Sequence, residues 1–307
     1  MLKKAINYLK KNGFKALIDR IMHLVGLYFF CVFRFGKVLK YLSKNLTNTI
    51  SYIKLRAKYY DKCNTDYALE TDKPTKKIYW CWLQGEENAP LLCKKCLQSL
   101  RRQFPNYEIV VVTDENMFSL VKLPDYIIEK YRKGIISRTH FSDILRTALI
   151  VEHGGVWIDS TVYCTGYNTP IFDYPMFVFQ DWKFDSVQPT VASNWFLSAY
   201  KGHPIFRCTL DLLYLYWKDY NSLENYYIYH LFFKMVTEKY FELWKQVPRF
   251  SNIPPHILQF EMFDRYSEVR FEQIKKMSDF HKLTYKHPRL SDGKVDGLMV
   301  EKILKNE

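Results

Sequence analysis

The sequence predicts an α/β fold with a mixed, mostly parallel sheet, because short apolar runs alternate with longer segments of helical periodicity. Three observations support this prediction. They are the alternation itself, the helix ends marked by proline and glycine, and carboxylates that directly follow two of the apolar runs. A chain of 307 residues is long enough for one large α/β domain and a smaller appendage. We expect ligands to bind where the parallel strands end.

The first two predicted strands are each followed by a helix. Residues 77–82 predict a first strand, and residues 91–104 follow with helical spacing that stops before Pro105. Residues 107–113 are a β-branched run that predicts a buried second strand. Residues 123–131 then predict another helix, so the pattern strand–helix occurs twice.

The next helix and strand are the most informative part of the chain. Residues 141–152 have the pattern of an amphipathic helix, which Gly154 and Gly155 end because glycine tolerates the left-handed turn of a helix stop. Residues 156–158 predict a short buried strand, with Asp159 at its carboxyl end. A carboxylate in this place predicts a polar pocket for a charged, hydroxyl-rich ligand.

The C-terminal half adds one strand and several helices to the prediction. Residues 175–179 are apolar and predict a strand. Long helices with many aromatic residues are expected at 203–220 and 226–244. The tail beyond residue 279 is basic and ends in a short helix.

Positive charge is concentrated at the N-terminus. Residues 1–62 contain fourteen Lys or Arg and two acidic residues, while the rest of this chain of net charge +13 is nearly balanced. The apolar run 21–33 is shorter than the ~20 residues of a spanning helix. Its basic flanks favour a helix lying on an anionic membrane surface. Simple packing on the following domain is the alternative. Nucleic-acid binding is disfavoured, because aliphatic residues and not spaced stacking aromatics separate the charges.

We therefore predict two parts, a basic amphipathic helical membrane-association segment at 1–72 and a second domain at 73–307. Seven cysteines at irregular spacing favour a reducing compartment. No small-residue cleavage site follows the apolar run, which argues against a signal peptide. These features together predict a peripheral protein on the cytoplasmic face of the cell membrane.

One motif resembles a glycosyltransferase signature. The pattern is S-D-x-x-R, a Gly-Gly pair and a strand that ends in D-x-T, and its first and last parts are Ser142, Asp143, Arg146, Asp159 and Thr161. In this order the chain resembles the bacterial capsular polysaccharide synthesis family. It is also similar to glycosyltransferase family 32 and to the glucosylating clostridial toxins. The resemblance implies a GT-A-type, Rossmann-like nucleotide-sugar transferase domain.

The resemblance implies roles for the residues of this motif. Asp143 and Arg146 lie three apart on one helix face and would hold the donor sugar; a surface ion pair is the alternative. Asp159 matches the first carboxylate of a D-x-D motif, and Thr161 stands where the second would be. With His281 these two would hold Mn²⁺ or Mg²⁺. A hydroxyl is a poor substitute for a carboxylate ligand, which weakens the metal prediction.

Four further residues are candidates for binding the donor. Trp82 ends the first predicted strand and could stack on uracil, or it could be a core residue. Lys282 and Lys286 lie in a segment that looks like the K-L-T-x-K ending of the capsular family. One of them could stabilise the leaving diphosphate, unless the tail is merely solvated. Asn194, in a segment that also looks family-like, could face the reacting sugar.

These inferences together predict a retaining glycosyltransferase. It would move a hexose from a UDP-sugar to a lipid-linked oligosaccharide of capsule or another surface polysaccharide. A membrane-bound N-terminus would raise the effective concentration of such an acceptor. The alternatives are a phosphotransferase of surface polymer synthesis and a non-catalytic protein that binds sugar nucleotides.

Overall fold

The structure is a computed structural model, and the residues that it describes are 45–69, 75–167, 170–171, 174–181 and 190–305. The chain divides into two compact units, Met1–Ile50 and Ser51–Glu307. Only residues 45–50 of the first unit are described, so the apolar run 21–33 and most of the predicted membrane-association segment lie outside the described residues. The boundary between residues 72 and 73 stays a prediction.

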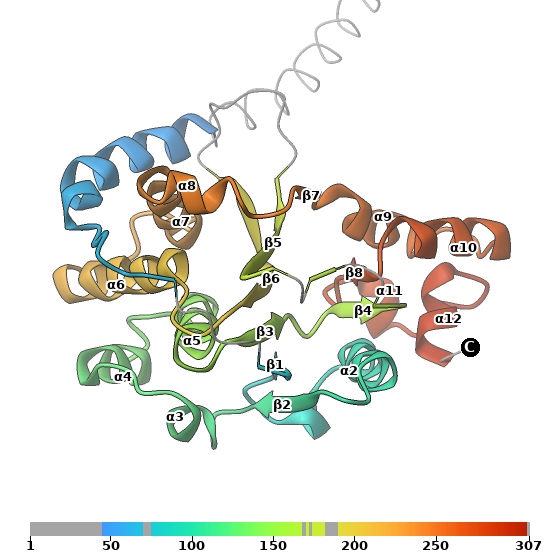
Figure 1. The fold of residues 1–307 in the computed structure, drawn as a ribbon. Coiled ribbons are helices and arrows are strands. Elements are labelled where there is room, and N and C mark those ends of the chain that lie inside the picture. Colours follow the sequence, from blue (N-terminus) through green and yellow to red (C-terminus); the bar gives the residue numbers. More distant parts are fainter. Residues whose placement is uncertain (1–44, 70–74, 168–169, 172–173, 182–189, 306–307) are drawn as a thin grey trace, which may run out of the picture. The chain divides into compact units, whose positions relative to one another are not determined.

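A six-stranded sheet forms the centre of the larger unit, in the order β2-β1-β3-β6-β5-β7 (Figure 1). Its strands are β1 (Lys77–Cys81), β2 (Glu108–Val112), β3 (Gly155–Ile158), β5 (Met176–Gln180), β6 (Ala192–Ala199) and β7 (Phe250–Ser251). Strand β1 runs parallel to β2 and β3, and β7 runs parallel to β5. Strand β6 is antiparallel to both of its neighbours, β3 and β5. The predicted α/β fold with a mixed, mostly parallel sheet is confirmed.

A second, two-stranded sheet pairs β4 (Val162–Cys164) with β8 (Phe280–Lys282) in antiparallel orientation. Strand β4 follows β3 after one turn, whereas β8 lies near the C-terminus. This pairing places the segment after residue 279 beside the end of β3.

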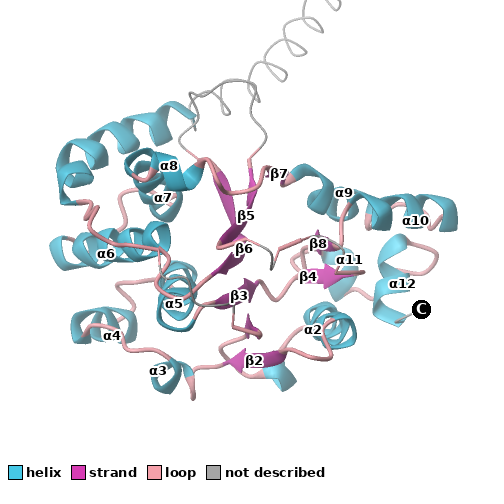
Figure 2. Cartoon of the chain, viewed as in Figure 1, coloured by secondary structure: helices cyan, strands magenta, loops and turns pink. Residues whose placement is uncertain are grey.

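Helices cover both faces of the main sheet (Figure 2). Besides the helical residues 51–59, the helices of the larger unit are α2 (Leu91–Gln103), α3 (Met117–Leu120), α4 (Asp125–Arg132), α5 (Arg138–His153), α6 (Pro204–Asp219), α7 (Ile228–Lys239), α8 (Phe241–Trp244), α9 (Ile253–Glu261), α10 (Glu268–Met277), α11 (Pro288–Ser291) and α12 (Met299–Lys305), with short 3-10 turns at η1 (Tyr60–Lys62) and η2 (Glu86–Asn88). In Figure 1, α5, α6 and α7 lie on one side of the sheet, and α2, α9, α10 and α12 lie on the other.

Alternate residues of β1 point into two different cores. Tyr79 packs into the core formed with α5, α6 and α7, whereas Ile78 and Trp80 pack into the core formed with α2. Residues 51–59 are helical and contribute Leu55 and Tyr59 to the first core. The sheet is therefore buried on both faces, which is typical of an α/β fold.

One predicted helix is wrong, and one strand inside the main sheet was missed. The expected helix over 226–244 is interrupted at Tyr240, whose backbone leaves the helical region with φ −95° and ψ 43°. Strand β6 was not predicted at all, although it lies between β3 and β5. Its sequence, with Ser193, Asn194 and Ser198 among apolar residues, has neither clean alternation nor a continuous apolar run.

The glycine pair after α5 is required by close backbone approach. Gly154 has φ +67°, and a Cβ atom there would lie 2.7 Å from the backbone nitrogen of Lys201. Gly155 has φ +96°, and its Cβ would lie 2.6 Å from the carbonyl oxygen of Lys77 on β1. Only glycine fits both positions without a backbone shift. The helix thus ends where the sequence predicts, and β3 enters the sheet directly.

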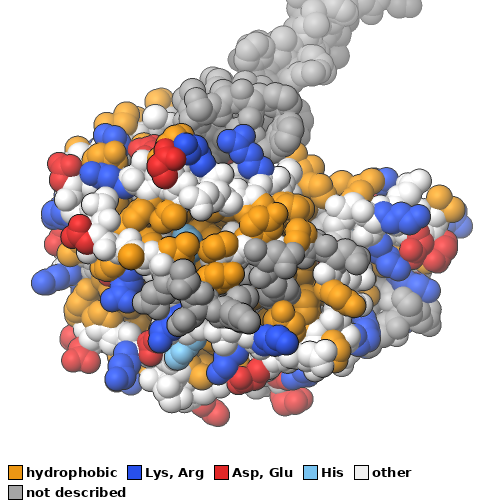
Figure 3. All heavy atoms as spheres, viewed as in Figure 1, with side chains coloured by type: hydrophobic (Ala, Val, Ile, Leu, Met, Phe, Trp, Pro, Cys, Tyr) orange, Lys and Arg blue, Asp and Glu red, His pale blue; other side chains and the backbone are white. Residues whose placement is uncertain are grey.

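The surface of the described residues carries charges of both signs. Basic and acidic side chains are interspersed on the face in Figure 3, as expected for a part of the chain with nearly balanced charge. Among the described residues, no helix has the length and apolar character needed to cross a membrane.

Candidate functional site

A cavity of about 470 Å³ opens where β1 and β3 end and where α5 begins. Six of the residues singled out from the sequence line it: Trp82, Arg146, Asp159, Thr161, Lys282 and Lys286. They come from four separate parts of the chain. The cavity lies at the carboxyl ends of parallel strands, as the sequence predicts.

Arg146 joins the two predicted carboxylates. Its Nη2 atom lies 3.5 Å from Asp143 Oδ1, one helical turn earlier on α5. Its Nη1 atom lies 3.2 Å from Asp159 Oδ1, just beyond the end of β3. The side chains of Asp143 and Arg146 are 8% exposed, so this pair is buried and is not the surface ion pair of the alternative interpretation.

Further contacts hold the Arg146 guanidinium in one orientation. Its Nε atom donates to the carbonyl oxygen of Ser142 at 3.1 Å, and Nη2 donates to Ser142 Oγ at 2.9 Å. Nη1 donates to the carbonyl oxygen of Asn194 at 2.6 Å. The guanidinium also lies over the ring of Trp157, 5.0 Å from its centroid.

Asn194 lies next to Asp143, although 51 positions separate them in the sequence. Its Nδ2 atom donates to Asp143 Oδ1 at 2.8 Å. On the other side of this carboxylate, His140 Nδ1 lies 3.7 Å from Oδ2. Strand β6 therefore brings a predicted sugar-facing amide to the predicted sugar-binding acid.

Lys282 contacts both oxygen-bearing side chains of the D-x-T motif. Its Nζ atom donates to Asp159 Oδ2 at 2.8 Å and to Thr161 Oγ1 at 2.7 Å. Pairing of β8 with β4 sets Lys282 opposite Val162, and the backbone nitrogen of Leu283 donates to the carbonyl oxygen of Thr161 at 2.8 Å. Backbone hydrogen bonds therefore fix this lysine beside the motif.

The charges of the site stabilise one another. Burial by itself would raise the pKa of Asp159, but the nearby Lys282 and Arg146 and hydrogen bonds from Lys282 and Trp157 lower that pKa below its ordinary value. Burial by itself would lower the pKa of Arg146, whereas Asp159 and Asp143 raise it. Both groups of this ion pair are therefore charged at neutral pH.

Aromatic side chains form another part of the cavity wall. Trp82 follows β1 directly, and its ring meets that of Tyr285 edge to face, with 5.4 Å between centroids. Trp82 is half-buried, and its indole Nε1 has no hydrogen-bond partner among the described residues. Lys286 is exposed at the same rim. Trp82 is thus neither a fully buried core residue nor a free surface residue.

His281, predicted as a metal ligand, is not brought to the cavity. Its Nε2 atom lies 3.0 Å from Thr165 Oγ1, and the residue is completely buried. Burial lowers the pKa of His281 to about 4. Since neighbouring residues on a strand point to opposite faces, His281 points away from the contacts that Lys282 makes.

The residues present do not fit the predicted divalent metal site. No group of three or more His, Cys, Asp or Glu within the described ranges is arranged to hold a metal ion. Both oxygens of Asp159 accept from positively charged or N–H donors, and Thr161 Oγ1 accepts from Lys282. An ammonium group therefore occupies the place between the two predicted ligands.

Two residues of the site, Arg138 and Trp157, were not among the candidates, although the sequence contained signals for them, and Ser142 was named in the motif without a role. Arg138 and Ser142 precede Arg146 by eight and four positions, so all three share one face of α5. Trp157 lies two residues before Asp159, and residues two apart on a strand share a face. Its Nε1 atom donates to Asp159 Oδ1 at 2.9 Å.

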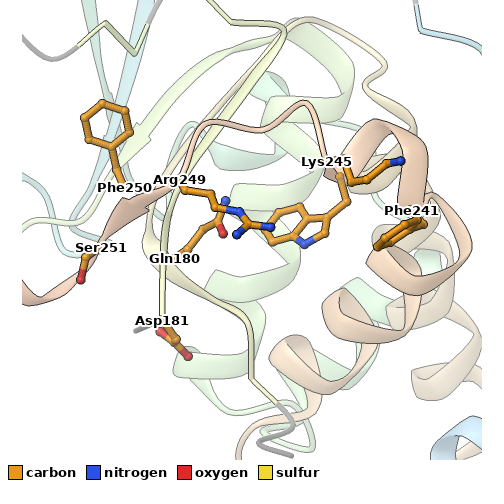
Figure 4. A pocket seen from close by; sticks show the side chains of 8 residues that line it. Gln180, Asp181, Phe241, Lys245, Arg249, Phe250 and Ser251 are labelled. Atoms are coloured by element: carbon orange, nitrogen blue, oxygen red, sulfur yellow. The ribbon is translucent and has the colours of Figure 1, made fainter. Parts of the chain in front are cut away.

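A second cavity of about 480 Å³ lies beside the end of β5 (Figure 4). Its lining includes Asp181, Phe241 and Arg249. Asn252 Nδ2 donates to Asp181 Oδ1 at 2.7 Å and to Ser193 Oγ at 3.1 Å. This network connects the rim of the second cavity to the residue before Asn194.

Comparisons with known proteins give one family match. A family model described as "Capsular polysaccharide synthesis protein" matches residues 34–302 of this chain. A search of curated proteins found no match. Among solved structures, the one described as "PaToxG Glycosyltransferase" is similar at 15% sequence identity and a TM-score of 0.39, over 77% of this chain and 95% of that chain. The family match includes every residue that lines the first cavity.

Proposed function

The chain belongs to the capsular polysaccharide synthesis protein family, and from this premise we propose that it is a retaining glycosyltransferase. Its donor would be a UDP-hexose, and its acceptor a lipid-linked oligosaccharide of capsule or another surface polysaccharide. The proposal rests mainly on the convergence of Arg146 and Asp159 at one cavity beside Lys282. Asp143 and Asn194 do not line this cavity, but the buried Asp143 pairs directly with Arg146. Such a cavity offers groups for sugar hydroxyls and for a diphosphate together.

The donor sugar would bind beside Arg146, which lines the cavity and pairs with the buried Asp143. Carboxylate and amide oxygens accept hydrogen bonds from sugar hydroxyls, and a guanidinium donates to them. Asp143 and Arg146 are held by Asn194 and by the carbonyl oxygen of Ser142, so little reorganisation accompanies binding. Orientation of the sugar by such fixed groups contributes to the rate, because the reacting atoms need one geometry.

The rest of the donor would extend along the cavity wall. Lys282, Lys286 and Arg138 line the cavity and would neutralise the diphosphate. Trp82 and Tyr285 offer aromatic surface for the uracil base. In this pose the nucleotide lies over the ends of β1 and β3.

We propose transfer on one face of the sugar. The bond from C1 to the departing diphosphate oxygen breaks with its electron pair on that oxygen, and the acceptor hydroxyl oxygen forms the new bond to C1. The hydroxyl proton passes to the departing oxygen, so no enzyme nucleophile is needed. Both oxygens of Asp159 already accept hydrogen bonds, from Arg146, Trp157 and Lys282. These contacts make the carboxylate a weak nucleophile, which supports a route without an enzyme nucleophile.

A panel of donors tests the proposal. The full chain is incubated with UDP-, GDP- and CDP-linked sugars, and the released nucleotide is measured. We expect a nucleoside diphosphate from one UDP-sugar, and a decrease of about a hundredfold or more for Asp143→Asn, because the amide cannot keep the charge that balances Arg146. The control is Asp292→Asn, since Asp292 is exposed and lies outside the cavity.

Two alternatives give different products in the same assay. A phosphotransferase would release a nucleoside monophosphate from a CDP-linked donor. A non-catalytic binding protein would release no nucleotide above the blank, although a donor would bind. Either result would contradict transfer of a hexose.

We also propose that residues 1–62 hold the enzyme on the cytoplasmic face of the membrane. The support is the excess of basic residues there, each worth about 1 kcal/mol near an anionic surface. Co-sedimentation of the full chain with phosphatidylglycerol vesicles should decrease when Arg34, Lys37, Lys40 and Lys44 are changed to Ser. Equal sedimentation of both proteins, or equal binding to neutral vesicles, would refute this attachment.

A further inference from the structure

The first cavity is rich in positive charge. Its described lining contains the basic side chains of Arg138, Arg146, Lys282 and Lys286, and Asp159 is the acidic one among them. A site that binds a divalent cation normally needs an excess of oxygen anions. This lining instead has an excess of positively charged side chains, which can neutralise a diphosphate without an added cation.

Lys282 lies between the two oxygens that the sequence suggested as metal ligands. The ammonium nitrogen is 2.8 Å from Asp159 Oδ2 and 2.7 Å from Thr161 Oγ1. A divalent cation on the same two oxygens would be in contact with this ammonium, and like charges at that distance repel strongly. The second oxygen of Asp159 does not offer another place, because Arg146 and Trp157 contact it.

The position of Lys282 is built into the fold. Strand β8 pairs it with Val162, and the next residue donates its backbone N–H to the Thr161 carbonyl oxygen at 2.8 Å. The side chains of Lys282 and Asp159 are 20% and 23% exposed, so both still face the cavity. An ammonium group has three N–H donors, and Asp159 and Thr161 engage two of them. The third can donate to a ligand in the cavity.

We propose that Lys282 takes the place of a divalent cation and that this chain binds and uses its nucleotide donor without a metal. This inference rests on the proposed function. Lys282 donates to the diphosphate oxygen on which negative charge develops when the bond from C1 breaks. Asp159 and Thr161 position Lys282 and do not ligate a metal.

Calorimetric titration of the full chain with UDP tests the inference. The titration is done in EDTA and again in MnCl₂, with CDP and GDP as further probes. We expect the UDP affinity in EDTA to be within about threefold of that in Mn²⁺. Electron paramagnetic resonance should detect no protein-bound Mn²⁺ before UDP is added.

Lys282→Met removes the charge and keeps the length of the side chain. We expect UDP affinity in EDTA to fall by about ten- to a hundredfold, which is typical of a lost charge-assisted hydrogen bond. Lys294→Met makes the same change of charge on an exposed residue outside the cavity, and it should bind UDP like the parent chain.

The double variant Thr161→Asp with Lys282→Met keeps the inference testable if the single variant does not fold. It restores a second carboxylate and removes the ammonium. We expect it to bind Mn²⁺ in the absence of nucleotide and to bind UDP at least about tenfold more tightly with Mn²⁺ than in EDTA. If the double variant binds UDP with the same affinity in Mn²⁺ and in EDTA, Lys282 does not take the place of a cation.

The outcomes separate this inference from the proposed function. If UDP binds the parent chain only with Mn²⁺, the inference is overturned, whereas the proposed transferase stands. If none of UDP, CDP and GDP binds under either condition, the proposed function fails, and the inference fails with it.

Discussion

Arg146 connects the parts of the site more than any other residue. It contacts the carboxylates of Asp143 and Asp159, the carbonyl oxygens of Ser142 and Asn194, and the ring of Trp157. These partners belong to α5, to the end of β3 and to β6. Five N–H donors in a planar fork can serve such separate acceptors, whereas the single ammonium of lysine cannot.

Arg146→Lys is therefore expected to damage catalysis while keeping the positive charge. We predict a decrease in kcat of roughly a hundredfold, because the acids lose their fixed orientation. The measurement is donor turnover at saturating substrate. Arg270→Lys is the matched control, since Arg270 pairs with Glu261 outside the cavity. Similar turnover in Arg146→Lys and Arg270→Lys would show that orientation by the guanidinium is unimportant.

At the scale of elements, the junction between α5 and β3 positions both halves of the motif. Helix α5 holds Asp143 and Arg146, and β3 ends just before Asp159. Gly154 and Gly155 connect them with positive φ at both positions. Any widening of this junction would separate Arg146 from Asp159.

Gly155→Ala should be strongly destabilising. Its Cβ atom would meet the carbonyl oxygen of Lys77 at 2.6 Å in a backbone conformation that L-residues rarely adopt. We expect the free energy of unfolding in urea to decrease by about 2–4 kcal/mol. Gly134 also has a positive φ, +70°, but nothing lies within 4 Å of a Cβ atom there. Gly134→Ala should therefore lower the free energy of unfolding by only about 1 kcal/mol. Equal losses in the two variants would show that close approach has no role.

The sequence predicted well those elements whose ends are marked locally. Helix α2 starts after Pro90 and ends before Pro105, and α5 ends at its glycine pair, as expected. Strand β6 has no such marks, and its position depends on hydrogen bonds to β3 and β5. A strand whose partners are distant in sequence is stabilised by tertiary context, which a single sequence does not reveal.

At the scale of the whole molecule, the site depends on contacts between distant parts of the chain. Lys282 and Asp159 are 123 positions apart, and pairing of β8 with β4 brings them together. Both residues were candidates from the sequence, but the sequence could not show that Lys282 donates a hydrogen bond to Asp159. The prediction of a metal at Asp159 and Thr161 came from the resemblance of this segment to a D-x-D motif, which does not show that Lys282 contacts both side chains.

The free energy of unfolding of the chain should decrease in mild acid. Burial lowers the pKa of His203, at the start of α6, to about 4, and its Nδ1 atom has no partner among the described residues. An unfolded histidine takes up a proton below about pH 6.5, whereas the folded one stays neutral until about pH 4. The stability from neutral His203 is therefore complete above pH 6.5 and is lost as the pH falls towards 4.

His203→Phe should reduce this acid sensitivity. Between pH 7 and pH 5 the parent chain should lose about 2 kcal/mol more of its free energy of unfolding than the variant does. Urea titrations at both pH values measure this difference. Burial also lowers the pKa of His230, but the negative charge of Asp143 partly offsets that effect. His230 should therefore contribute less than His203 to the loss of stability in acid. The same pH dependence in His203→Phe and the parent chain would exclude His203 as the cause.

A crystal structure of the chain with the sugar nucleotide that the donor panel identifies tests the proposed donor site most directly. We expect the hexose hydroxyls to contact Asp143 and Arg146 and a diphosphate oxygen to accept a hydrogen bond from Lys282. A nucleotide bound in another cavity, or a hexose without contact to either residue, would contradict the proposed donor site.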